Sequence, residues 1–241
     1  MKWNNQASEA INKVPFFVRK RVKARVEEEV KGFQVETCFG PTGCPNRAVI
    51  TEGLADELER LLAQKELKAF LKGMVDVPLK MHHEFRVSVS DCPNACSRPQ
   101  IVDIGLIGAS RPVITEQACT QCQACLQACK ESAVVLKEKG PQINFDKCLY
   151  CGSCIRQCPT GTIAEQESGY RVLIGGKLGR HPRLAQDLDR IFPTESIPAV
   201  IDVVVEFYKK NCRRGERLGA IVEVEGLEPL LVEMKNKGLL T

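Results

Sequence analysis

The stretch CTQCQACLQAC, residues 119–129, carries four cysteines in the spacing C-x2-C-x2-C-x3-C. The stretch CLYCGSCIRQC, residues 148–158, repeats that spacing and is followed by Pro159. Thiolate sulfur is the soft ligand that iron–sulfur clusters require, and two matching runs of this kind make coincidence negligible. Zinc sites usually carry two separate cysteine pairs instead of such runs. The repeat therefore predicts two [4Fe–4S] clusters.

The repeat resembles the two-cluster bacterial ferredoxins, in which the fourth cysteine of each run binds the cluster of the other run. The implied ligands of one cluster are Cys119, Cys122, Cys125 and Cys158, and those of the other are Cys129, Cys148, Cys151 and Cys154. Lys130 replaces the proline that usually follows the first run, which removes no ligand. We expect residues 130–147 to form a hairpin and turns.

Four further cysteines form two close pairs, Cys38 with Cys44 and Cys92 with Cys96. Both pairs lie in segments rich in glycine, proline and asparagine, which are typical of turns. Such turns expose backbone N–H groups that can donate hydrogen bonds to cluster sulfurs and tune the reduction potential. These residues alone predict a third [4Fe–4S] cluster. The last cysteine, Cys212, lies in a helical pattern and is interpreted as a structural thiol.

The C-x5-C and C-x3-C pairs together resemble the signature of the sulfite and nitrite reductase family. In that family the last cysteine of the signature also binds the iron of sirohaem, which implies this role for Cys96. The resemblance continues at residues 169–180 and 215–219, so it covers about residues 36–241. The insertion point of the ferredoxin-like repeat is similar to that of dissimilatory sulfite reductase subunits. The implied cofactors are three [4Fe–4S] clusters and sirohaem.

Sirohaem carries many carboxylates and the substrates of this family are anions, so the resemblance implies cationic side chains around the site. The candidates for cofactor binding are Cys96, Arg47, Arg98, Gly175, Gly176 and Arg180. The candidates for a catalytic role are Arg86, Arg98 and Lys177. A cation at any of these positions could equally be a solvated surface charge. Family members carry a Lys-x-Lys pair at the positions of Glu84 and Arg86, so Glu84 reverses one charge near the substrate.

Hydrophobic periodicity predicts an α+β fold. Helices are predicted at residues 8–31, at 51–72 with Thr51 as N-cap, and at roughly 183–191, 196–211 and 227–237. Strands are predicted at residues 85–89, 101–107 and 170–174. The three predicted units are a helical module (1–35), a sirohaem/[4Fe–4S] reductase half-domain (36–110 and 166–241) and an inserted 2[4Fe–4S] ferredoxin module (111–165).

The N-terminal stretch from Trp3 to Glu29 resembles the small C-terminal domain of light-independent protochlorophyllide reductase subunits. That resemblance implies a small helical module in a reductase. Many sirohaem reductases contain two related halves, whereas this chain contains one. We therefore expect a homo-oligomer, a second reductase subunit, or an arrangement like that of the small single-repeat enzymes.

The overall composition excludes several other classes. The net charge of +4 is mild, and no basic stripe interleaved with aromatic residues predicts nucleic-acid binding. No apolar run approaches the length of a membrane span, and the first residues lack the apolar stretch of a signal peptide. We expect a cytoplasmic protein, because in a reducing compartment clustered cysteines are metal ligands more often than disulfides.

These observations predict an enzyme that accepts electrons from an external low-potential donor through its ferredoxin-like clusters. The electrons would then reach a sirohaem-coupled cluster, where sulfite is reduced. Nitrite is an alternative substrate. A second alternative is a non-catalytic electron-transfer subunit of a larger reductase, which Glu84 and the missing half favour.

Overall fold

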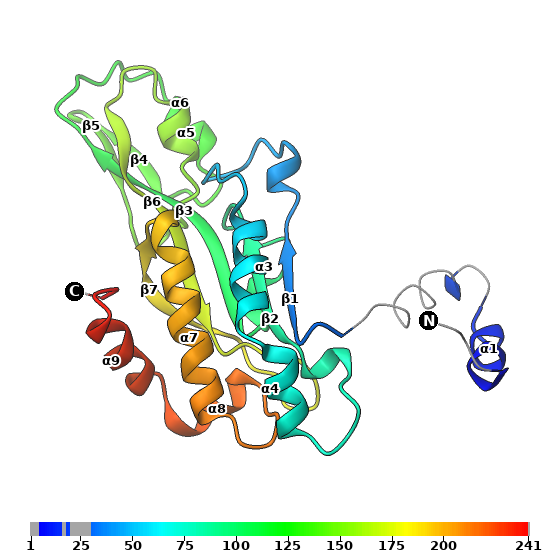
Figure 1. The fold of residues 1–241 in the computed structure, drawn as a ribbon. Coiled ribbons are helices and arrows are strands. Elements are labelled where there is room, and N and C mark those ends of the chain that lie inside the picture. Colours follow the sequence, from blue (N-terminus) through cyan, green and yellow to red (C-terminus); the bar gives the residue numbers. More distant parts are fainter. Residues whose placement is uncertain (1–4, 16–17, 20–29, 241) are drawn as a thin grey trace.

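The computed structural model describes residues 5–15, 18–19 and 30–240. Its main body is a five-stranded sheet in the order β1-β2-β3-β6-β7, covered by helices on one face (Figure 1). The strands are β1 (Phe33–Thr37), β2 (Phe85–Ser90), β3 (Ile104–Ile114), β6 (Ile163–Ile174) and β7 (Gln186–Phe192). The helices of this body are α3 (Leu54–Gln64), α4 (Leu67–Met74), α7 (Ile197–Asn211), α8 (Leu218–Glu225) and α9 (Glu228–Asn236). The predicted α+β class is confirmed.

The sheet is parallel on one side and antiparallel on the other. β1, β2 and β3 run parallel, and β6 and β7 follow in antiparallel pairing. α3 and α4 connect β1 to β2, whereas the loop of residues 91–103 connects β2 to β3. A crossover between parallel strands needs about a dozen residues, and this loop supplies them with only a 3-10 turn at Pro99–Ile101.

The side chains of β2 show which face the loop covers, because they alternate between the two faces of the sheet. Phe85 and Val87 belong to the buried core beneath the helices. Ser88 and Ser90 point the other way, toward the loop. The Ser88 hydroxyl donates to the carbonyl of Ser97 at 2.8 Å, and the hydroxyls of Ser90 and Ser97 lie 2.6 Å apart. The loop therefore covers the face opposite the helices.

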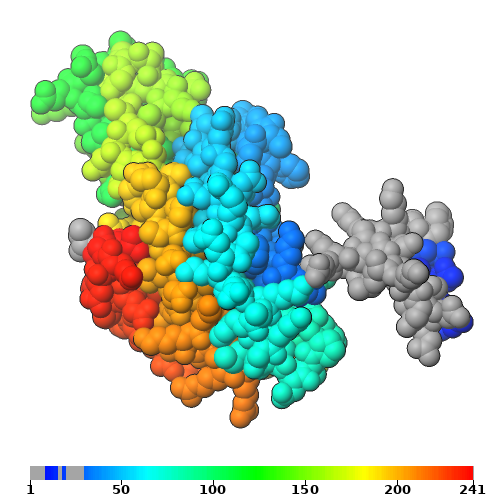
Figure 2. Space-filling model, in the orientation of Figure 1, coloured from blue at the N-terminus to red at the C-terminus, as the bar shows by residue number. Residues whose placement is uncertain are grey.

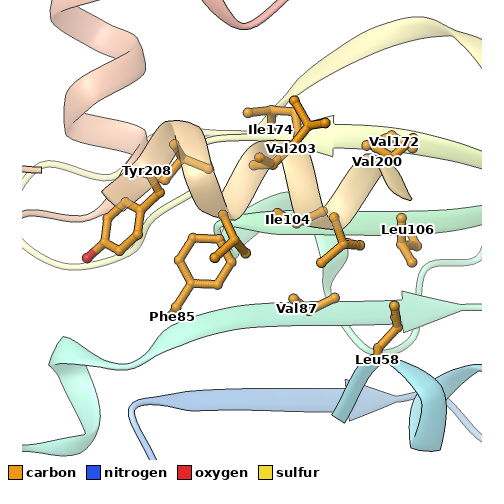
Figure 3. Packing of buried hydrophobic residues seen from close by; sticks show 14 of the residues in the cluster. Leu58, Phe85, Val87, Ile104, Leu106, Val172, Ile174, Val200, Val203 and Tyr208 are labelled. Atoms are coloured by element: carbon orange, nitrogen blue, oxygen red, sulfur yellow. The ribbon is translucent and has the colours of Figure 1, made fainter. Parts of the chain in front are cut away.

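The hydrophobic core lies between the sheet and its covering helices (Figure 3). Leu58 of α3 and Val200 of α7 have no exposed surface, and neither do Ile104 of β3 and Val172 of β6. Each such side chain contributes about 1.5–3 kcal/mol when it is removed from water. This packing holds β1 and β2 in place, and the loops that carry Cys38 and Cys92 follow these two strands.

β3 and β6 continue as an antiparallel pair that carries the inserted segment, up to Ile114 opposite Ile163. The insert contains α5 (Ala124–Ala128), α6 (Ser153–Gln157), and a hairpin of β4 (Val134–Lys137) and β5 (Gly140–Ile143). The hairpin expected within residues 130–147 is thus confirmed. The insert projects from one end of the body (Figure 2).

Two predicted helices of the main body are corrected. The helix predicted at residues 183–191 is wrong, because residues 186–192 form the edge strand β7, where Asp187 pairs with Arg171 of β6. The helix predicted at residues 51–72 is two helices, since the backbone turns at Glu66 with a φ of 50°. Its N-cap residue is Gly53 instead of Thr51.

The N-terminal helix predicted over residues 8–31 is only partly represented. α1 spans Asn5–Asn12 and ends before Pro15, while residues 16–17 and 20–29 lie outside the described residues. Much of the stretch that resembles protochlorophyllide reductase also lies there, so that similarity stays a prediction. In the described part of the chain, no helix combines the length and apolar character needed to cross a membrane.

Candidate functional site

Two of the cysteine-bearing segments begin where neighbouring strands end. Parallel strands place their carboxyl ends at one edge of the sheet, and Cys38 directly follows β1 whereas Cys92 lies two residues after β2. The Cys38 N–H donates to the carbonyl of Val89 at 2.9 Å, which extends the pairing of the two strands. Cys44 and Cys96 lie further along the two loops. The fold therefore directs both cysteine pairs to the same edge.

The four thiols of these pairs lie close enough to interact electrostatically. Burial raises the pKa of the Cys92 thiol, and Cys38, Cys96 and Cys44 raise it further. Cys92 is buried, Cys38 and Cys44 are half-buried, and Cys96 is exposed. We refer to these four residues as the strand-end thiols. Solvent therefore reaches the strand-end thiols from the side of Cys96.

Hydrogen-bond donors are directed at the strand-end thiols. The N–H groups of Gly40 and Asp91 donate to the Cys38 sulfur at 3.2 and 3.4 Å. The side-chain amide of Asn94 donates to the Cys96 sulfur at 2.9 Å. Such donors stabilise sulfur that carries negative charge, as cluster-bound thiolate does. The donor set and its surroundings fit an iron–sulfur cluster.

Two glycines of β3 let the loop with Cys92 and Cys96 lie directly on the strand. A Cβ atom at Gly105 would stand 2.1 Å from the carbonyl oxygen of Pro99. A Cβ atom at Gly108 would stand 2.4 Å from the carbonyl oxygen of Asp91. Neither distance is sterically tolerable, so only glycine permits this approach. The position of the loop on the sheet is therefore tightly fixed.

A second group of thiols lies in the insert and comprises Cys129, Cys148, Cys151 and Cys154. Burial raises the pKa of Cys154 to about 11, and the other three thiols add to the rise. Burial also raises the pKa of Cys148, and here Cys151 and Cys129 contribute while Arg111 opposes the shift. Cys129 thus lies with the second cysteine run although it belongs to the first.

A third group unites the remaining thiols of the first run. Burial raises the pKa of Cys125, with Cys119 and Cys122 contributing. Cys158 packs in an apolar cluster that contains Cys125 and also Cys129 and Cys154 of the second group. Burial alone would raise the pKa of Cys158, but hydrogen bonds such as that from the Ile163 N–H at 3.3 Å lower it below its ordinary value.

Neither of these groups, nor the strand-end thiols, forms a compact site for one ion. Among the described residues, no three histidine, cysteine or acidic side chains could hold a single metal ion. A four-iron cluster holds its thiolates farther apart than a single ion does, because the inorganic core lies between them.

A cavity of about 270 Å³ separates the insert from the strand-end thiols. Cys92 and Asn94 line it on one side, and Lys130 and Cys151 line it on the other. Ser110 of β3 forms a β-bridge with Cys151, which joins this part of the insert to the sheet. The second thiol group therefore faces the loop of Cys92.

The predicted cations divide into two sets. Arg98 is exposed two residues after Cys96, and Arg180 is exposed in the loop after β6. Arg47 is half-buried and close to Asp91: burial raises the pKa of that carboxyl, and Arg47 opposes the rise. Within the described part of the chain these three arginines form no ion pair, which leaves their charge available to an anion.

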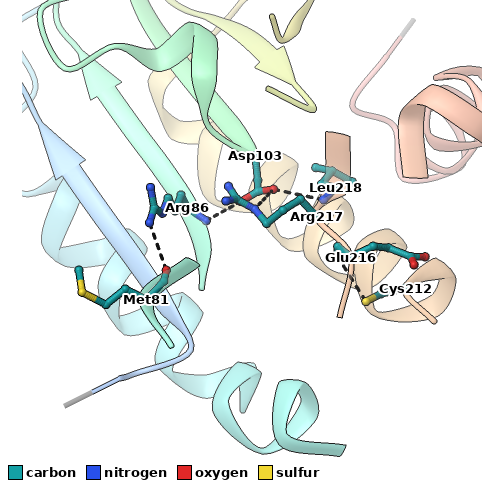
Figure 4. Close-up of polar contacts among 7 residues, drawn as sticks. All are labelled: Met81, Arg86, Asp103, Cys212, Glu216, Arg217 and Leu218. Carbon is teal, nitrogen blue, oxygen red and sulfur yellow. Dashed lines mark hydrogen bonds and ion pairs between the residues drawn. The ribbon is translucent and has the colours of Figure 1, made fainter. Parts of the chain in front are cut away.

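The other two predicted cations are engaged within the protein. The Lys177 ammonium pairs with Glu223 of α8 at 2.9 Å. The Arg86 guanidinium donates to the carbonyl of Met81 at 3.1 Å (Figure 4). Arg86 also lies at the start of β2, at the end of the strand opposite Cys92.

The Glu84 carboxylate lies inside the protein, whereas its alignment with the Lys-x-Lys pair implied a position facing the substrate. Glu84 is 6% exposed, and its carboxylate accepts hydrogen bonds from the N–H groups of Lys31 and Gly32 at 2.9 and 3.3 Å. The expectation is corrected, because the carboxylate anchors the backbone that leads into β1.

The two glycines predicted to contact the cofactor have packing roles. A Cβ atom at Gly176 would stand 2.5 Å from the carbonyl oxygen of Gln100. Gly175 has a φ of 81° and lies against Gly219 and Val222 of α8. At both positions protein atoms fill the place that a Cβ atom would take.

A buried ion pair that was not predicted from the sequence ties β3 to α8 (Figure 4). Asp103 has no exposed surface, and its carboxylate accepts hydrogen bonds from Arg217 Nε at 3.0 Å and Nη2 at 2.5 Å. The N–H groups of Arg86 and Leu218 donate to the same carboxylate at 2.8 and 3.2 Å. The sequence signal here was the family resemblance of residues 215–219, which gave no partner for Arg217.

The α+β fold, with four thiols gathered at one edge of its sheet, is typical of an iron–sulfur protein. Residues 33–238 match the family described as the nitrite and sulphite reductase 4Fe-4S domain. Because this match covers most of the sequence, the chain belongs to that family of oxidoreductases.

Two curated relatives are sulfite reductases by name. The chain is 36% identical over 199 residues to coenzyme F420-dependent sulfite reductase of Methanocaldococcus jannaschii, a match that covers 80% of this chain and 30% of that protein. It is 28% identical over 105 residues to one of the anaerobic sulfite reductase subunits of Salmonella typhimurium, covering 44% of this chain and 26% of that protein. The chain thus spans less than a third of the length of either relative.

The fold also has a solved counterpart. Dissimilatory sulfite reductase I superposes with a TM-score of 0.58 at 19% identity, covering 83% of this chain and 51% of that chain. This likeness shows that the sheet and helices of the chain share the fold of that structure.

Proposed function

We propose that the chain is a sulfite reductase-like oxidoreductase that passes electrons through ferredoxin-type clusters to a sirohaem-coupled [4Fe–4S] centre. The observation that carries the proposal is the convergence of the four strand-end thiols at one edge of the sheet, in a chain of this family. The two curated relatives described above bear the name sulfite reductase, which favours sulfite over nitrite as the substrate.

The thiol groups support the ligand sets of three [4Fe–4S] clusters. The proposed sets are Cys38, Cys44, Cys92 and Cys96; Cys129, Cys148, Cys151 and Cys154; and Cys119, Cys122, Cys125 and Cys158. Cys158 joins the last set through the resemblance to ferredoxins. The exchange of the fourth cysteine between runs, proposed from the resemblance to ferredoxins, is supported by the interaction of Cys129 with the second run.

Cys96 is the proposed thiolate that also binds the sirohaem iron, since it alone of the strand-end thiols is exposed. When bound, sirohaem supplies an iron centre at which an anion can be reduced by several electrons. Arg98, Arg47 and Arg180 are the side chains of this chain that would hold its carboxylates or the anion. Arg86 and Lys177 are already engaged with Met81 and Glu223, which weakens their predicted catalytic role.

The proposed route of electrons begins at the insert, which an external low-potential donor reduces. It continues to the strand-end cluster, because Cys151 and Cys92 line one cavity between the two units. The chain spans less than a third of the two relatives named sulfite reductase, so a second copy or another reductase subunit is proposed to supply the remaining cations.

A non-catalytic electron-transfer subunit is the second candidate. The engagement of Arg86 and Lys177 favours it, since two of the three cations predicted for catalysis have partners within the protein. This candidate requires the same three clusters but no productive sirohaem site.

Optical spectra of anaerobically purified, iron-replete protein test the proposal. We expect sirohaem bands that shift when sulfite is added to the reduced protein, with nitrite as a parallel sample. Cys96→Ser should abolish these bands. Cys212→Ser should retain them, because the buried Cys212 thiol interacts with Tyr208 and with the backbone of Gly215 and Glu216. If the spectra show only iron–sulfur absorption although sirohaem was supplied, the reductase proposal fails and the electron-transfer subunit is the remaining candidate.

A further inference from the structure

Arg111 lies where the insert joins the sheet and is held by residues of both. Its guanidinium carbon stands 5.3 Å from the ring centre of Phe145 and 5.8 Å from that of Tyr150. These rings belong to the segment of the insert that carries Cys148. The same guanidinium pairs with Glu167 of β6 at 3.2 Å. Cations are attracted to aromatic faces, so the two rings hold the charge beside this segment.

The backbone around Arg111 is fixed to the same segment. The N–H of Ser110 donates to the carbonyl of Tyr150 at 2.7 Å, and Ser110 forms its β-bridge with Cys151. The pairing of β3 with β6 is irregular between Arg111 and Pro112, which re-aims the side chains there. The guanidinium is therefore directed toward the insert by the fold itself.

The position of Arg111 is not explained by stability alone. Its Nε atom is buried and has no hydrogen-bond partner among the described residues. A buried donor without a partner costs free energy, and an ion pair as exposed as that with Glu167 returns little of it. A costly placement beside a thiol group indicates that the charge serves that group.

The charge of Arg111 reaches the second thiol group. Arg111 and Cys148 line the same groove, which has a volume of about 800 Å³. The rings that hold the guanidinium belong to Phe145 and Tyr150, which flank Cys148 in the sequence, so the charge lies beside this thiol. A positive charge stabilises any group that gains an electron nearby, and net charge around a cluster is one determinant of its potential.

We propose that the Arg111 guanidinium raises the reduction potential of the cluster bound by Cys129, Cys148, Cys151 and Cys154. Because this role rests on the proposed function, it requires that cluster to be present. The cluster gains one electron from the external low-potential donor and one unit of negative charge, which Arg111 stabilises. Electrons delivered to the insert therefore collect on the cluster that faces Cys92.

Four variants of the full chain separate the charge of Arg111 from its structural role. Arg111→Gln removes the cation, and Arg111→Lys keeps it. Glu167→Gln removes the opposing acid. Arg171→Gln is the matched control, because Arg171 lines the same groove but pairs with Asp187 of β7. Potentials are measured by anaerobic titration with dithionite, followed by electron paramagnetic resonance, after the iron content has been determined.

For Arg111→Gln we expect a fall in one cluster potential, with the ratio of reduced to oxidised cluster about tenfold lower at a fixed potential. That ratio corresponds to about 59 mV for a one-electron couple. Glu167→Gln should shift the same cluster in the opposite direction. Arg111→Lys and Arg171→Gln should leave all potentials close to those of the unmodified chain.

Unchanged potentials in an iron-replete Arg111→Gln variant would overturn the proposal. If that variant loses iron, Glu167→Gln decides, since a raised potential supports the role of Arg111 and an unchanged one refutes it. An unmodified chain without clusters in its insert would instead refute the proposed function, a result that the iron content reveals before any titration.

Discussion

Asp103 holds two segments of the main body together that are far apart in the sequence. Its fully buried carboxylate binds Arg217 and two backbone N–H groups, and so joins β3 to the start of α8. Burial alone would lower the pKa of Arg217, but Asp103 raises it above its ordinary value. The two charges are stable in the interior only as a pair.

Asp103→Asn should therefore lower the free energy of unfolding by about 3–5 kcal/mol, because it leaves the Arg217 charge buried without compensation. Anaerobic guanidinium denaturation measures the change. Glu225→Gln is the matched control, since the exposed Glu225 should tolerate the same acid-to-amide change within about 0.5 kcal/mol. Equal stabilities of the two variants would show that the pair contributes nothing.

At the scale of elements, the loop of residues 91–103 positions the strand-end thiols by lying on β3. This contact depends on glycine, because the carbonyl of Pro99 occupies the place of a Cβ atom at Gly105. Sequence periodicity identified β2 and α7 correctly but gave no sign of this contact. Periodicity reports which face of an element is buried, and not which backbone lies against it.

Gly105→Ala should displace the loop and deplete the strand-end cluster, while the insert keeps its two clusters. Iron content should fall by the equivalent of one cluster, as measured by iron analysis and electron paramagnetic resonance. Gly73→Ala serves as control: nothing lies within 4 Å of its Cβ position, and alanine is favoured over glycine inside a helix by about 0.5–1 kcal/mol. Full iron content in both variants would contradict the role of this contact.

The wrong prediction of a helix at residues 183–191 is also explained at the scale of elements. The segment has apolar residues at spacings that fit a helix, yet residues 186–192 pair with β6 as an edge strand. Pairing with β6 buries Ile191 and Phe192 and joins Asp187 to Arg171. These partners are distant in sequence or on another strand, so the local pattern could not reveal them.

At the scale of the whole molecule, the insert is attached through one antiparallel pair. β3 and β6 remain paired up to Ile114 and Ile163, and the N–H of Thr115 donates to the carbonyl of Thr162 at 2.9 Å. Because the pair already has the geometry of a hairpin at this point, the body should not need the insert in order to fold.

Replacing residues 116–161 with Asn-Gly should therefore give a folded body with only the strand-end cluster. Asn-Gly fits a two-residue hairpin turn between Thr115 and Thr162. Circular dichroism should show cooperative unfolding, and iron analysis should show the loss of two clusters. A shortened chain that does not unfold cooperatively would mean that the insert and the body stabilise each other.

The sequence by itself determined the chemistry of the site. Cysteine spacing is a local property, and thiolate identity sets the class of metal that can bind, so the three thiol groups and their ligand type could be predicted. The hairpin of the insert and the α+β class also follow from local patterns.

Tertiary structure alone decided which charges are available around those thiols. Glu84 anchors the backbone before β1, Lys177 pairs with Glu223, and Arg111 is placed against the insert by two rings. Each of these contacts joins residues that are tens of positions apart in the chain. The energy of a charge depends on its burial and its partners, and both are set only when distant segments pack together.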